Sequence, residues 1–140
     1  MVPEFGRLLA MRVVIAAAQN LQVHLFKNDP TPPDDKDVVI ADLDEADFDG
    51  YDPIDSIAFP TPAINGDDAA ETLSPTLTWE TTGTGELPQT IYGMYATIND
   101  PAGGGNKLFW FERFDAPVSL VGTGEQVVKK LKLLDTNYQP

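Results

Sequence analysis

The sequence contains no cysteine and a single histidine, His24, among its 140 residues. Without cysteine, disulfide bridges and thiolate nucleophiles are excluded, although the redox compartment stays open. One histidine, with no cysteine and no second histidine, supports neither a zinc site nor a Ser-His-Asp triad. Because His24 lies between Val23 and Leu25, we expect it to be an ordinary strand residue on the polar face of its strand.

Basic residues and long apolar runs are scarce. Nine Lys and Arg stand against 22 Asp and Glu, which gives a formal net charge of −13 and a sequence pI of about 4.1. Such a surface repels phosphate and anionic lipid, so we expect neither nucleic acid nor a membrane as a partner. No apolar run approaches the roughly 20 residues of a membrane span. The run 13–18 is also too short for the core of a signal peptide, so we interpret the N-terminal segment as retained structure.

Residues 1–20 are predicted to form one N-terminal α-helix. Pro3 suits a first helical turn, because its missing donor has no partner there. Phe5, Leu8 and Leu9 begin a series of apolar residues at helical spacing. The other faces of this helix are also largely apolar, so it needs burial on more than one side.

Residues 21–140 are predicted to form an antiparallel β domain, with an acidic loop region over 34–72. The runs VHLF, TLTWE, TIYGMYATI, KLFWFERF and EQVVKKLKLL are alternating, or rich in aromatic and β-branched residues. Several of them are joined by loops too short for crossover helices, which indicates antiparallel pairing. The predicted fold class is therefore mainly β with one N-terminal α-helix, arranged as an antiparallel β-sandwich or half-barrel.

The acidic stretch LDEADFDGYDPID, residues 43–55, carries six acidic side chains and no basic one. Counted as a calcium loop from Glu45, it places Asp47 third and Asp49 fifth, but the twelfth position is a serine and the closing carboxylate is missing. An oxygen site built from these three residues and Asp55 is one reading. We favour the other, a solvated loop without metal that offers its charge to a partner.

The glycine-rich pieces GTGE and AGGGN raise the question of phosphate binding. Neither is followed by the lysine and the helix that a P-loop requires. With 22 acidic residues, carboxylate pairs at the spacing of a glycosidase arise by chance and indicate nothing. We therefore predict that the chain is not an enzyme and holds no cofactor.

Aromatic residues gather in the C-terminal half, where Trp110, Phe111 and Phe114 follow a run with two tyrosines. Core packing explains them best, because one face of such a hairpin must be buried. A carbohydrate platform is the alternative, and it would need Trp79 or Trp110 to be exposed. Both faces of the strand around Trp110 are apolar, so we expect the helix or a partner to cover the second face.

The order of these segments resembles a family of small structural proteins of tailed bacteriophages. The similarity rests on an opening VPEFGRLL, a strand VHLFKND leading into TP, the acidic LDEADFDGY, the run TIYGMYAT and the final LFWFERFDAPVSL before a lysine-rich strand. The resemblance covers most of the chain. The chain differs from the family by Glu4 after Pro3 and by a longer acidic loop.

The resemblance implies a component of the virion, assembled in the host cytoplasm, without an enzymatic activity or a cofactor. A cement or decoration subunit on the capsid is the first expectation, and a tail or fibre module that binds host carbohydrate is the second. The expected partners are the major capsid protein or other virion proteins, with a homo-oligomer on the particle. The expected interface residues are Phe5, Leu8, Leu9 and Arg12 of the helix, and Asp44, Asp47 and Asp49 of the acidic stretch.

Overall fold

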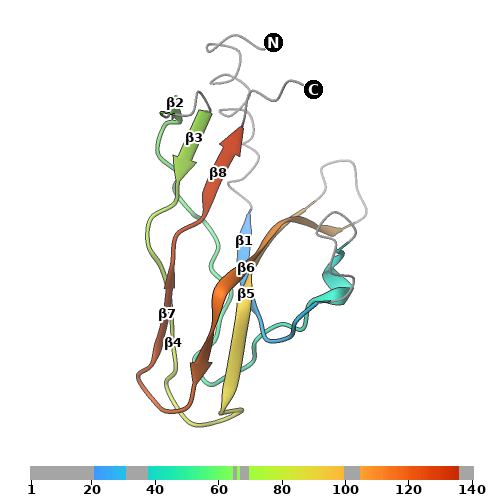
Figure 1. Cartoon of the computed structure of the whole chain (residues 1–140), viewed down its shortest axis with the longest axis vertical. Coiled ribbons are helices and arrows are strands. Elements are labelled where there is room, and N and C mark those ends of the chain that lie inside the picture. The colour runs from blue at the N-terminus through green and yellow to red at the C-terminus, as the bar shows by residue number, and fades with distance from the viewer. Residues whose placement is uncertain (1–20, 31–37, 65, 67–69, 100–104, 136–140) are drawn as a thin grey trace.

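The computed structural model describes residues 21–30, 38–64, 66, 70–99 and 105–135 (Figure 1). The helix predicted over residues 1–20 lies outside them. The described residues are mainly β, as predicted, and their strand pairs are antiparallel. No helix among them is long and apolar enough to cross a membrane. In chain order the elements are β1 (Gln22–Phe26), η3 (Ile40–Asp42), β2 (Ala63–Ile64), β3 (Ala70–Leu73), β4 (Leu77–Glu80), β5 (Gln89–Asn99), β6 (Asn106–Leu120), β7 (Gln126–Lys129) and β8 (Lys132–Asp135).

One layer is the sheet with strand order β1-β5-β6. Its central strand β5 is rich in β-branched and aromatic residues, which favour the extended backbone. β1 pairs with the C-terminal half of β5, from Gln22 opposite Thr97 to Phe26 opposite Gly93. β6 follows β5 along its whole length but shifts register twice, between Ile91 and Gly93 and between Ala96 and Thr97 on β5. Such irregularities bend an edge strand, and β6 curves visibly across the molecule in Figure 1.

The second layer is a long ribbon in which β3 and β4 run against β8 and β7. The two halves meet at Ser74, whose N–H donates to the Leu131 carbonyl at 2.8 Å. Its Oγ accepts the Leu131 N–H, also at 2.8 Å. Pro75 has no N–H for a ladder bond, and the regular pairing is interrupted there. β2 pairs with β3 at the far end of the ribbon.

The main core lies between these two layers. On β4, Leu77 and Trp79 are buried while Thr78 and Glu80 are exposed, which is the alternation that the sequence predicted. Burying one such leucine completely contributes roughly 1.5–3 kcal/mol relative to leaving it in water. The cluster includes buried residues of both layers, among them Leu21, Val23, Leu25, Leu77, Trp79, Ile91, Met94, Val127, Leu131 and Leu133.

The acidic stretch runs beside the free edge of β1. The Ala46 N–H donates to the Leu25 carbonyl at 2.9 Å, and Ile54 exchanges two backbone hydrogen bonds of 2.8 and 2.9 Å with Val23. Ala46 and Phe48 are buried in the main core. The stretch is irregular, as expected, but it is bound to the sheet along its backbone, whereas the sequence favoured a solvated loop.

The second face of the β1-β5-β6 sheet carries a smaller apolar cluster. Phe26 and Tyr95 of the sheet pack there against Val38 and Leu43, and Phe111 of β6 packs against the edge of the cluster. The sequence predicted that the helix or a partner covers this face. In the described residues, the segment around η3 covers part of this face. Val38 and Leu43, which lie on either side of the 3-10 turn, pack onto Phe26 and Tyr95.

Candidate functional site

His24 and Glu45 form a polar centre between β1 and the acidic stretch. Glu45 Oε2 lies 2.5 Å from His24 Nδ1, and it also accepts a hydrogen bond from the Tyr95 hydroxyl at 3.3 Å. The other imidazole nitrogen, Nε2, lies 3.0 Å from Thr97 Oγ1. The imidazole therefore joins the acidic stretch to the central strand of the sheet.

The expectation that His24 lies on a polar face is wrong. Only 8% of its surface is exposed, and its ring stacks on Tyr95 with centroids 4.6 Å apart. The prediction failed because strand alternation places residues on faces but does not reveal that a second segment covers one of them. Burial, together with the nearby negative charge of Glu45, raises the pKa of Tyr95 and of Tyr51 well above the usual range of tyrosine.

Asp47 connects the acidic stretch to the ends of β1 and β5. Its Oδ1 accepts hydrogen bonds from Lys27 Nζ at 2.9 Å and from Gln89 Nε2 at 2.7 Å. These two bonds, that of Lys27 first, hold the pKa of the Asp47 carboxyl below its usual value, and the same contact raises the pKa of Lys27. Half of the Asp47 side chain is exposed to water, so the pair contributes little to stability.

Asp49 connects the acidic stretch to the loop between β4 and β5. Its carboxylate accepts the Gly85 N–H at 3.0 Å, and its carbonyl accepts the Thr82 N–H at 2.9 Å. A Cβ at Gly83 or Gly85 would meet the Asp49 carboxylate at 2.5 Å. GTGE occurs twice in the chain, and its first copy, residues 83–86, wraps closely around an aspartate of the chain itself.

These contacts bear on the metal-site alternative. Glu45, Asp47 and Asp49 contact different partners, namely His24, Lys27 and Gly85. Across the described residues, no three His, Cys, Asp or Glu side chains come together in a way that could hold a metal ion. The acidic side chains in this part of the chain are therefore spread along the stretch as separate contacts.

The predicted interface residues fall into two groups. Asp44, Asp47 and Asp49 are exposed on the acidic stretch, although the last two also make the contacts described above. The other four, which belong to the predicted helix, lie outside the described residues: Phe5, Leu8, Leu9 and Arg12.

The structure does not support a carbohydrate platform at Trp79. Trp79 is only 3% exposed in the main core, and its buried indole Nε1 lacks a hydrogen-bond partner in the described part of the chain. Trp79 is buried because position 79 falls on the inward face of β4. Trp110 is half-buried, and it packs against the same core from β6.

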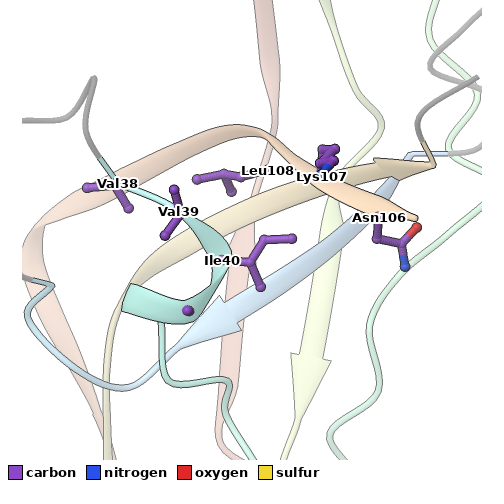
Figure 2. A pocket seen from close by; sticks show the side chains of 7 residues that line it. Val38, Val39, Ile40, Asn106, Lys107 and Leu108 are labelled. Carbon is purple, nitrogen blue, oxygen red and sulfur yellow. The ribbon is translucent and has the colours of Figure 1, made fainter. Parts of the chain in front are cut away.

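A pocket lies between the segment around η3 and the beginning of β6. Its volume is about 390 Å³, and Figure 2 shows its side chains around the gap between these two elements. Val39, at its rim, is 54% exposed, and Phe109, which follows the lining residue Leu108, is 41% exposed. The lining residues are Val38, Val39, Ile40, Ala41, Asn106, Lys107 and Leu108.

Neither the polar centre nor this pocket was predicted from the sequence. Residues 38–40, read VVI, were an available signal, because they form an apolar run enclosed by acidic residues. The run from Leu108 to Phe111 in β6, apolar on both faces, indicated a covered face but not which segment covers it. No local signal links His24 with Glu45, since they are 21 positions apart.

The chain was compared with known proteins at three levels. Family models, curated proteins and solved structures give no match. A functional proposal for this chain therefore rests on its own residues and on the order of its segments.

Proposed function

We propose that the chain is a structural subunit of a tailed-bacteriophage virion, without enzymatic activity, that binds to the capsid as a cement or decoration protein. The order of its sequence segments supports this assignment, since it resembles that family over most of the chain. The proposed location is the virion, and the proposed partner is the major capsid protein.

One observation carries the proposal, the apolar surface at the η3 end of the β1-β5-β6 sheet. Val39 is exposed there, and it lines the pocket. Exposed apolar side chains beside a pocket suit a contact with an apolar protrusion of another protein. We assign this surface to a capsid subunit, because burial of such side chains across a subunit boundary is what a cement protein requires.

The finer architecture is part of the same proposal. The two layers with a shared core fit a β-sandwich, in which the acidic stretch closes one side between β1 and β4. The helix proposed for residues 1–20 supplies a second apolar anchor, with Phe5, Leu8 and Leu9 toward the partner and Arg12 at its border. A cement subunit then stabilises the shell, because rupture has to break these contacts as well as those between capsid subunits.

The acidic stretch has a separate role in this proposal. Its exposed carboxylates, such as Asp44, face either a basic patch on the capsid or the solvent. In the first case they guide the subunit to its place on the shell. In the second case they keep negatively charged particles apart. The binding rate at low and high salt separates the two, since only the first is slowed by screening.

The test uses shells prepared with and without the protein. We expect added subunits to bind assembled shells and to raise the temperature at which the shells rupture. The variant Val39→Asp places a charge in the contact surface, so we expect it to lose shell binding while remaining folded. Val128→Asp is the matched control, because Val128 is 48% exposed on the ribbon, which belongs to the other layer.

Two outcomes contradict the cement role. One is an equal rupture temperature with and without bound protein. The other is a glycan-binding activity that is lost in Trp110→Ala, which would instead indicate the carbohydrate-binding tail or fibre module. That alternative has lost one of its two candidate side chains, since Trp79 is buried.

A further inference from the structure

The two edges of the β1-β5-β6 sheet differ. The β1 edge is covered by the acidic stretch, through bonds such as that from the Ala46 N–H to the Leu25 carbonyl. β6 forms the other edge, and one of its sides pairs with β5. Among the described residues, no backbone hydrogen bond outside that pairing involves residues 106–120. In this part of the chain, the outer side of β6 is therefore an open strand edge, to which another strand can add.

We propose that this edge binds the same strand of a second copy, so that residues 106–113 of the two copies pair antiparallel about a twofold axis. A twofold contact requires a surface that is complementary to itself. The charges of residues 106–113 have this property. The dimer goes beyond the virion role proposed above and does not depend on it.

Lys107 and Glu112 carry the complementarity. Both side chains are exposed, and neither forms an ion pair with another described residue. Lys107 lies opposite Ile98 of β5, and Glu112 lies opposite Met94. Because Ile98 and Met94 are four positions apart on one strand, they share a face of the sheet. Lys107 and Glu112 therefore share that face as well.

The register shift in this part of β6 is the reason that the two charges share a face. Phe109 is inserted as an extra residue, because its two neighbours in β6 lie opposite consecutive residues of β5. Without this insertion, Lys107 and Glu112, which are an odd number of positions apart, would lie on opposite faces. The bulge thus brings a positive and a negative charge to one side of the edge strand.

A twofold axis near Phe109 and Trp110 places Lys107 of each copy opposite Glu112 of the other. One such pair of charges then lies on each side of the axis. Opposite charges directly across two strands stabilise their pairing, and like charges in the same place destabilise it. The charges therefore favour this one register of the two edge strands.

The apolar residues of the segment agree with the same register. It places Leu108 of one copy opposite Phe111 of the other. Both side chains pack against the small apolar cluster on the second face of the sheet, so that the clusters of the two copies become continuous. Phe109, which is 41% exposed in the single chain, lies at the centre of the contact.

Charged residues on an edge strand commonly prevent pairing, and lysine is the usual one. A lysine serves that purpose where pairing would leave it without an acidic partner. In β6, an acidic residue occupies the position that antiparallel self-pairing sets against Lys107. The charges of this edge therefore select a partner strand and a register.

The dimer contact and the proposed capsid contact are neighbours but can be tested separately. Asn106, Lys107 and Leu108 line the pocket and belong to the paired segment, whereas Val39 lies on the segment around η3. Val39→Asp is therefore expected to lose shell binding and to keep the dimer. A chain that dimerises without binding shells contradicts only the capsid role, and a monomeric chain that binds shells contradicts only the dimer.

Sedimentation equilibrium of the full chain tests the dimer. Physiological ionic strength screens the repulsion between two chains of net charge −13. We expect the parent chain to show a reversible monomer–dimer equilibrium. Lys107→Glu and Glu112→Lys each set two pairs of like charges in the contact, so we expect each to raise the dissociation constant about tenfold or more.

An equimolar mixture of these two variants tests the register. In a mixed dimer, the substituted position 107 of one chain faces the substituted position 112 of the other, and the unchanged Lys107 and Glu112 face each other. Both pairs are again of opposite charge, so we expect the mixture to dimerise about as strongly as the parent. The matched controls are Lys130→Glu and Glu80→Lys, which make the same charge changes at exposed positions of the ribbon and should each dimerise like the parent.

Three results would overturn the proposal. One is a parent chain that stays monomeric at every concentration at which it is soluble. Another is a parent dimer that neither variant weakens, since a different surface then makes the contact. The third is a mixture that is no more dimeric than its two components. Circular dichroism checks the fold of each variant, and if one of them does not fold, a single chain with both substitutions replaces the mixture with the same expected dimerisation.

Discussion

Gly93 shows how one residue without a side chain determines the packing of two strands. It lies on β5 between Phe26 of β1 and Arg113 of β6. A Cβ at this position would clash with the Glu112 carbonyl oxygen and with the Phe26 ring. The ring thus occupies the space that a side chain at position 93 would need.

We expect Gly93→Ala to lower the free energy of unfolding by about 1–3 kcal/mol, the usual cost of overpacking. Denaturant unfolding monitored by circular dichroism measures it. Gly66→Ala is the control, since among the described residues no atom beyond its chain neighbours lies within 4 Å of the position that a Cβ would take there. An equal effect of the two substitutions would show that Phe26 moves away without cost.

For single residues, the sequence predicted the burial of some side chains but not of others. The inward positions of Leu77 and Trp79 follow from strand alternation, which is a local property. The burial of His24 depends on Glu45 and Thr97, which lie far from it in the chain. Alternation assigns a residue to one face of a strand, but contacts with segments distant in the sequence decide whether that face is exposed to solvent.

At the scale of elements, the acidic stretch is fixed to the β4–β5 loop by Asp49. We expect Asp49→Ala to lower the free energy of unfolding by about 1 kcal/mol, because the Gly85 N–H loses its charged acceptor. Asp52→Ala, at an exposed position of the same stretch, should change it by less than about 0.5 kcal/mol. The measurement is again denaturant unfolding, and equal effects at the two positions would contradict the role of Asp49.

The strands themselves were predictable, whereas the attachment of the acidic stretch was not. Periodicity and turn residues mark β4, β5 and β6 in the sequence. The stretch is joined to β1 through backbone groups, as at Ala46 and Leu25, and backbone groups carry no sequence signature. Its high charge also favours a solvated loop in any local interpretation, because the side-chain partners Lys27 and His24 lie about 20 positions away in the chain.

At the scale of the whole molecule, the net charge of −13 means that any added salt changes Tm by screening repulsion. This general effect of ionic strength must be separated from metal binding. We expect calcium chloride to leave Tm unchanged relative to magnesium chloride at the same ionic strength. A native calcium site would instead stabilise the fold by roughly 2.7 kcal/mol at a hundredfold excess over Kd. A calcium-specific rise of Tm, abolished by replacing both Asp47 and Asp49 with Asn, would contradict this prediction.

The ribbon also has a consequence for how the protein forms during translation. Ala70 of β3 pairs with Asp135 of β8, and Gln22 of β1 pairs with Thr97 of β5. Each early strand therefore leaves the ribosome long before its partner is made. Folding dominated by such distant pairings typically takes milliseconds to seconds. Nascent β4 lacks its partner until β7 has emerged, and nascent β3 lacks the pairing with β8 until Asp135 has emerged. During that time these edges can pair with those of other nascent chains on the same polysome.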